Sequence, residues 1–315
     1  GLNWTASTGF DATAQRSVGF SRFGYNIDLF TAQTPDGARN TFNGDTRVLT
    51  LDSKLSYNKD LGSTWTTATT VGLQVFNDRT NNRTGGSQSF PGPGIEVVGA
   101  GGANITTGET FLTTVNGGYF GQSQIGFQNI AFMNIGGRYD FSSAFGASAP
   151  GVFYPKISFS VVPSDLSGWG SPLGLSTFRV RAAWGQSGRQ PGAFDRFTTF
   201  SPLSSSLGAG LQPGQLGNQD LKPEIATELE GGFEAGFLEN RLAFEFTYWD
   251  RKVEDGLVTR QFATSGGFRQ AQLTNIGQID GSGYEFNLRG QAWRSARSTV
   301  ELFANAAYLK QTLTS

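Results

Sequence analysis

The sequence predicts an all-β protein, an antiparallel transmembrane β-barrel, from its composition, the period of its apolar residues and the lengths of its connections. Of the 315 residues, 37% are hydrophobic and 13% aromatic. Only 16% are charged, against about 25% in a typical soluble domain. A barrel wall is one residue thick, apolar toward lipid and polar toward its interior, so it favours aromatic, Gly, Ser, Thr and Asn residues. The 44 glycines and the single Met fit such a wall.

The composition also excludes several kinds of chemistry. The chain has no Cys and no His, which removes disulfides, thiolate catalysis, a Ser-His-Asp relay and Cys- or His-based metal sites. A net charge of -1 gives no basic surface for nucleic acid. We therefore expect no enzyme activity, no cofactor, no metal and no nucleic-acid partner.

Apolar and polar residues alternate along the chain with a period of two. In one run, Phe244 and Phe246 alternate with Glu245 and Thr247. Such runs often reach about ten residues, which matches the roughly 9–11 that a tilted strand needs to cross lipid. Residues 110–137 carry no charge, but their Gln and Gly content does not suit a membrane helix. We predict eleven strands, which start near Leu2, Thr46, Ser63, Val115, Ile130, Val152, Leu175, Glu224, Arg241, Ile279 and Thr299.

Short and long connections mostly alternate between these strands. Outer-membrane barrels have short periplasmic turns and longer extracellular loops, so the alternation assigns the two sides. The connections at 142–151 and 163–174 fit this rule less well, and residues 77–102 are interpreted as mobile surface. The short turns lie at 59–62, 128–129, 238–240 and 294–296, and the long segments are 17–45, 77–114, 188–223 and 254–278.

Aromatic residues lie close to the predicted strand ends. Trp and Tyr prefer the two lipid–water interfaces of a membrane protein. We therefore predict two aromatic belts, although ordinary packing of these residues in a soluble sheet is the alternative. Phe237, Trp293 and Trp169 lie beside the short-turn ends, and Trp249 and Trp184 lie near the opposite ends.

Several segments resemble the TonB-dependent transporters, in the order and at the approximate spacing of that family. Residues 218–224 (NQDLKPE), followed by Glu228 and Glu230, resemble one signature, and residues 273–277 (LTNIG) resemble a second. Residues 119–122, 140–146, 153–156 and 184–188 are similar to the SusC/RagA branch, although 140–146 lacks the Gly and Arg of that pattern. The family signature residues are Leu221, Lys222, Pro223, Glu224, Glu228, Asn275, Gly277, Gly283 and Glu285.

This resemblance implies TonB-dependent import of a nutrient oligosaccharide or peptide across the bacterial outer membrane. It implies a barrel of about 22 strands, so we expect residues 1–315 to form about half of one barrel domain, without the plug domain and the TonB-recruiting segment. The implied partners are outer-membrane lipid, the remainder of the barrel and its plug, the TonB complex, a SusD-like surface lipoprotein and the substrate. The alternatives are a passive pore, a structural or surface scaffold barrel, and a secreted soluble β-protein.

Charged residues on the polar faces of the strands are candidates for the barrel lumen. We interpret them as an ion-pair network against which a plug docks. Paired carboxylates could also serve a glycosidase or a Ca²⁺ site, but the surrounding ligand pattern is missing. These candidates are Lys156, Arg179, Arg181, Glu228, Glu230, Glu234, Glu245, Glu285 and Arg289.

Two further sets of residues lie in or beside the long segments. Arg189, Phe194, Arg196, Phe197 and Phe200 are candidates for contact with substrate, or for packing that orders the loop. In the first signature, Leu221 is expected to anchor the incoming loop and Pro223 to open a strand, where its missing N–H is tolerated. We interpret the signature mainly as a structural device that joins the loop to the wall, and direct substrate contact is the alternative.

Overall fold

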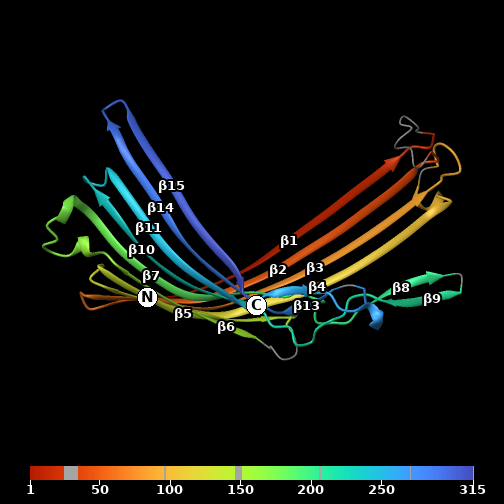
Figure 1. The fold of residues 1–315 in the computed structure, drawn as a ribbon, viewed down its shortest axis with the longest axis horizontal. Helices are drawn as coiled ribbons and strands as arrows, with labels where there is room; N and C mark the ends of the chain where they lie inside the picture. Colours follow the sequence, from red (N-terminus) through yellow and green to blue (C-terminus); the bar gives the residue numbers. More distant parts are fainter. Residues whose placement is uncertain (25–34, 96, 146–150, 206, 270, 315) are drawn as a thin grey trace. The chain divides into compact units, whose positions relative to one another are not determined.

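The computed structural model describes residues 1–24, 35–95, 97–145, 151–205, 207–269 and 271–314. Its main feature is an eleven-stranded antiparallel sheet in which the strands follow one another in sequence order (Figure 1). Among the described residues, no helix is long and apolar enough to span a membrane. The strands are β1 Leu2–Ser21, β2 Ala38–Leu61, β3 Trp65–Gln88, β4 Ala103–Phe127, β5 Ala131–Ser142, β6 Val152–Val161, β7 Leu175–Arg189, β10 Glu224–Phe237, β11 Leu242–Glu254, β14 Gln278–Arg294 and β15 Thr299–Thr314.

Two small hairpins stand apart from this sheet, inside long connections. Strands β8 (Phe200–Ser205) and β9 (Gly208–Pro213) pair between β7 and β10, and β12 (Leu257–Arg260) and β13 (Gln272–Asn275) pair between β11 and β14. These hairpins are not predicted from the sequence, because their strands are only four to six residues long. The short 3-10 helices are η1 Val98–Ala100, η2 Pro163–Asp165, η3 Pro172–Gly174 and η4 Thr264–Gly266.

The chain divides into two compact units. Unit 1 contains residues 1–6, 52–74 and 117–315, and unit 2 contains residues 7–51 and 75–116. Unit 1 holds all of β5, β6, β7, β10, β11, β14 and β15, together with both small hairpins.

The prediction of eleven strands is confirmed, but two strand starts are wrong. Strand β2 begins at Ala38 and β4 at Ala103, and the predicted mobile surface at 77–102 is strand as far as Gln88. These stretches are rich in Thr, Asn and Gly on both faces of the strands. A strand whose two faces are both wet shows no apolar alternation, so the period-two signal disappears although the strand continues.

The short turns at 128–129 and 238–240 are confirmed. Gln128 and Asn129 have φ values of 49° and 57°, and Leu238, Glu239 and Asn240 have values of 54°, 60° and 62°. These left-handed conformations are unusual for residues other than Gly, Asn and Asp, so the tight geometry is imposed by the flanking strands.

The strands of unit 1 separate polar and apolar side chains cleanly. We call the face that carries Arg181, Glu230 and Glu245 the polar face. The opposite, apolar face carries rings that touch across strands β7, β10, β11 and β14, with Phe246 and Phe286 at 5.1 Å between ring centroids. Phe286 is nevertheless 42% exposed and Leu288 43% exposed. An apolar face left this open is typical of a wall that meets lipid.

Candidate functional site

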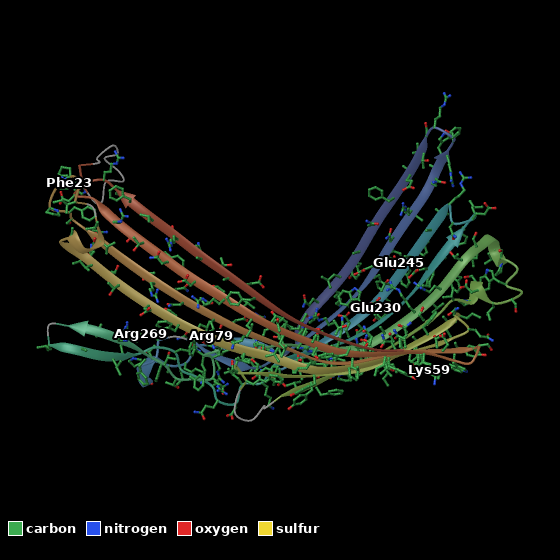
Figure 2. The ribbon with its side chains drawn as sticks, turned by 180° about the vertical axis from the view of Figure 1, so that it is seen from behind. Phe23, Lys59, Arg79, Glu230, Glu245 and Arg269 are labelled. Carbon is green, nitrogen blue, oxygen red and sulfur yellow. The ribbon has the colours of Figure 1, made fainter. Side chains whose placement is uncertain are left out.

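Arg181 is the centre of an ion-pair network on the polar face. From β7 it reaches β10, where its Nη1 lies 3.0 Å from Glu230 Oε1. It also reaches β11, where its Nη2 donates to Glu245 Oε1 at 2.7 Å and to Thr247 Oγ1 at 2.8 Å. Its Nε lies 3.9 Å from Glu234 Oε1. Figure 2 shows Glu230 and Glu245 on these neighbouring strands. One guanidinium therefore holds three carboxylates from two strands.

Arg179 makes a weaker contact beside this centre. Its Nη1 lies 3.5 Å from Glu234 Oε2, and its side chain is 49% exposed. The register of β7 and β10 places Arg179 directly opposite Glu234, so the pair joins two adjacent strands only. An exposed pair of this kind contributes about 0–1 kcal/mol.

A hollow of about 710 Å³ on the polar face is lined by the same network and by further charges. Glu228, Glu285 and Arg251 line it without an ion pair or a side-chain hydrogen bond among the described residues. On this part of the face, Arg179, Arg181 and Arg251 meet five carboxylates, those of Glu228, Glu230, Glu234, Glu245 and Glu285. Lys156 and Arg289 line adjoining hollows with Glu228 and Glu245. The carboxylates without an ion pair among the described residues, Glu228 and Glu285, are therefore the positions in this hollow that can receive a further cationic group.

Trp249 lies in this hollow, so the prediction that it belongs to an interface belt is wrong. It is opposite Glu230 in the register of β10 and β11, and it lines the hollow with Arg251. Its ring lies over Gly283, where an added Cβ would meet Trp249 Cε2 at 2.8 Å. The signature glycine therefore makes room for an indole. The period-two alternation does place Trp249 on the polar face, because Trp249 and Glu245 are four residues apart on one strand and side chains an even number of positions apart share a face.

Two other predicted lumen residues have partners elsewhere on the wall. Lys156 Nζ donates to Gln122 Oε1 at 2.7 Å, and Arg289 Nη2 donates to Glu301 Oε2 at 2.8 Å. Lys156 also lines a second hollow, of about 510 Å³. Sequence reasoning missed the polar chain along this hollow, in which Gln74 Nε2 donates to Asp52 Oδ2 at 3.3 Å and Arg138 Nη1 donates to Gln74 Oε1 at 3.3 Å.

The five loop candidates separate into packed and exposed residues. Arg196 donates to the backbone oxygen of Phe145, a fully buried residue, and its guanidinium lies 4.4 Å from the ring of Phe197. Arg196 therefore orders the loop. Arg189, at the end of β7, is exposed. The rings of Phe194, Phe197 and Phe200 are 48%, 45% and 54% exposed, and they stay candidates for contact with substrate.

The two signature segments meet in a clasp formed by the side chain of Asn275. Its Oδ1 accepts a hydrogen bond from Lys222 N at 2.8 Å, and its Nδ2 donates to Lys222 O at 2.8 Å and to Asp255 O at 2.9 Å. Glu224 Oε2 accepts from Leu257 N at 3.1 Å. The two signature segments therefore have a structural reason to carry these residue types, because the contacts tie the connection before β10 to the connection before β14.

Neighbouring residues reinforce this clasp. Asn218 Nδ2 donates to Leu273 O at 3.3 Å, and Gln272 Nε2 donates to Gly217 O at 2.7 Å. Leu221 is 0% exposed and Pro223 is fully buried. Lys222 projects outward and Gly277 has a φ of 87°, a conformation that favours glycine.

Replacement of Asn275 by Ala is expected to open the clasp without unfolding the wall. Three hydrogen bonds are lost, and two carbonyls and one N–H lose their partner, a cost of roughly 1–3 kcal/mol that falls on the connections. Hydrogen exchange at the amides of Lys222, Glu224 and residues 255–257 should accelerate. Asn287→Ala is the matched control, since that side chain has no hydrogen bond among the described residues. Unchanged exchange in Asn275→Ala would show that the clasp does not hold the two connections.

Comparison with known proteins places this site in a family. Residues 1–314 match the family model described as TonB dependent receptor-like, beta-barrel. Two curated relatives come from Formosa agariphila. TonB-dependent receptor P26 is 27% identical over 198 residues, which are 59% of this chain and 20% of the relative. TonB-dependent receptor P3 is 25% identical over 188 residues, which are 58% of this chain and 18% of the relative.

Solved structures share the fold. A structure of the RagAB peptide transporter superposes over 100% of this chain and 35% of its own chain, with a TM-score of 0.90 and 20% identity. The outer membrane transporter YddB from Escherichia coli superposes over 96% of this chain and 40% of its own, with a TM-score of 0.59 and 11% identity. The expected likeness to the SusC/RagA branch thus holds in the fold.

The matches also show how much of a relative this chain represents. It spans about a fifth of the length of the curated relatives and about a third of the chain in the RagAB structure. The strands form a partial barrel of the kind that this family places in the bacterial outer membrane. Because the family model covers residues 1–314, the chain belongs to the TonB-dependent receptor-like β-barrel family.

Proposed function

We propose that the chain forms part of the wall and extracellular loops of an outer-membrane importer that takes up an oligosaccharide or a peptide with energy delivered by TonB. The observation that carries the proposal is the charged polar face, on which Glu228 and Glu285 have no ion pair among the residues that the structure describes. Carboxylates toward the lumen also suit a passive pore that selects cations, which is the alternative function. A wall that docks a removable plug does need complementary charge, and arginines or lysines of a plug would fit here.

The extracellular connections supply the other part of the proposed function, which is contact with substrate. The clasp and the buried Leu221 hold them in one arrangement, which leaves Phe194, Phe197 and Phe200 exposed. Exposed rings on an ordered support can stack on sugar rings or hold apolar peptide side chains. A surface lipoprotein of the SusD type is the partner that we propose above these connections. The name of the RagAB peptide transporter makes peptides the first substrate to test. The chain itself would perform no bond chemistry.

Loss of the complete protein from its host is expected to abolish uptake of its nutrient, and an uncoupler of the proton gradient should stop uptake in the wild type to the same extent. Labelled peptides and labelled oligosaccharides would be supplied separately, at concentrations too low for passive entry to dominate. Uptake that needs the protein but persists with the uncoupler would identify a passive pore. Uptake that is unchanged without the protein would favour a surface scaffold.

A further inference from the structure

Within unit 2, the segments 38–51 of β2 and 75–88 of β3 pair in a register that places two arginines, Arg47 and Arg79, side by side. The hydroxyls of Thr46 and Thr80 are 3.4 Å apart, and Thr41 Oγ1 donates to Gly85 O at 3.2 Å. Both contacts belong to one antiparallel register. In that register Arg47 lies opposite Arg79. Cβ atoms of residues directly opposite are about 4.5–5.5 Å apart.

On β2 and β3, Arg47 and Arg79 lie on the apolar face, just beyond the last apolar residues that these two strands place on it. Side chains two positions apart share a face, so Arg47 lies on the face of Leu49 and Leu51, which are 51% and 39% exposed. On β3, Arg79 shares the face of Val75. The arginines follow the apolar residues by about 7 Å along β2. Arg47 and Arg79 therefore lie where the apolar part of β2 and β3 ends and their polar part begins.

The two guanidinium groups have no partner in the part of the chain that the structure describes. Both residues are exposed, and neither side chain has an ion pair or a hydrogen bond among the described residues. The next arginine on the same face of β3 behaves differently, since Arg83 Nε donates to Glu109 Oε1 at 2.7 Å. Like charges directly opposite in a sheet are destabilising. An anion held between Arg47 and Arg79 would turn this repulsion into two attractive contacts.

Further donors surround the arginine pair. Asn77 and Asn81 flank Arg79 on the same face of β3, and neither side chain has a hydrogen-bond partner among the described residues. Their amide N–H groups are donors that no described residue uses. Asp45, the neighbour of Arg47 on the same face of β2, is the acidic side chain nearest in the register. The group of Arg47, Arg79, Asn77 and Asn81 is therefore rich in donors and positively charged.

We propose that Arg47 and Arg79 bind the phosphate of a phosphorylated lipid headgroup in the outer leaflet of the outer membrane. Planar guanidinium groups match phosphate oxygens in charge and in geometry. The long connections place this end of the strands on the extracellular side. Leu49, Leu51 and Val75, which lie next to the pair toward the middle of the strands, would contact the acyl chains of the same lipid. The proposal concerns the outside of the wall, and it does not depend on what the protein transports.

The test uses the complete protein, purified in detergent, with lipid A that carries its phosphates and with lipid A from which they have been removed. Native mass spectrometry counts the retained lipid, and titration gives the affinity. We expect phosphate-dependent binding that falls about fivefold for Arg47→Gln or Arg79→Gln. Asp45→Asn should raise the affinity. Lys59→Gln, on the same face of β2 at its opposite end, is the matched control and should leave the affinity unchanged.

A second measurement separates a binding defect from a folding defect. Without lipid, Arg47→Gln and Arg79→Gln remove a repulsion, so thermal stability should be equal to or above that of the wild type. With phosphorylated lipid, the wild type should gain more stability than either variant. Three results would overturn the proposal: equal affinity in the wild type and both variants, equal binding of lipid A without phosphate, or displacement of the lipid by millimolar inorganic phosphate.

Discussion

Arg181→Met is expected to destabilise the wall more than any other single replacement on its polar face. Arg181 holds Glu230, Glu234 and Glu245, and Met fills a similar length without charge. Three carboxylates from two neighbouring strands would then face one another. Removal of one partner from a buried ion pair costs about 3–5 kcal/mol, but the Arg181 side chain is 33% exposed. Solvent screening reduces the expected loss to roughly 1–3 kcal/mol.

Arg179→Met provides a matched comparison on the same strand and the same face. Its contact with Glu234 is a single pair at 3.5 Å with a half-exposed side chain, so the expected loss is below about 1 kcal/mol. Both variants would be unfolded with urea in detergent, as complete proteins. Equal losses in the two variants would show that Arg181 is not the centre of the network.

A second replacement identifies the origin of the loss. If repulsion among carboxylates dominates, Arg181→Met combined with Glu245→Gln should recover part of the stability, because one charge fewer is left uncompensated. Additive losses in the double variant would show that lost packing of the Arg181 stem, and not charge, determines the effect. High salt should narrow the gap between Arg181→Met and the wild type for the same reason.

The number of strands in the main sheet and the division of their faces could be predicted from sequence, since lipid on one side and water on the other impose a period of two. Phe244 and Phe246 on one face, with Glu245 and Thr247 on the other, show this along β11. The same reasoning fails where both faces are wet, as in the starts of β2 and β4. Polar residues on both sides of a strand resemble a loop in sequence.

The contacts of the candidate site could be predicted only in part. The alternation assigns Arg181 and Glu230 to one face, but it does not say that a single guanidinium collects three carboxylates. That depends on the register of β7, β10 and β11, which is fixed by pairing along the whole strands. The clasp is harder still to predict from the sequence, because Asn275 and Lys222 are 53 residues apart. The family resemblance marked both residues without giving the contact between them.

Leu221→Ala is expected to loosen the connections before β10 and β14 while the sheet stays folded. Leu221 has no exposed surface and lies between the β8–β9 hairpin and the start of β10. Removal of a fully buried Leu side chain costs about 2–5 kcal/mol. The lost contacts belong to the connection, so the cost falls on its local opening and not on the hydrogen bonds between β10 and β11. Leu211→Ala, at a residue that is 71% exposed on β9, is the matched control.

Hydrogen exchange tests where the effect of Leu221→Ala is located. Residues 217–224 and 272–275 should exchange together, because Asn218, Gln272 and Asn275 join these two segments. Residues 229–236 of β10 should keep wild-type protection. If the signature serves to position the substrate-facing rings, uptake should fall in Leu221→Ala although the protein reaches the membrane in normal amount. Uniform loss of protection through β10 and β11 would instead make Leu221 part of the wall, and normal uptake with opened connections would separate the signature from substrate binding.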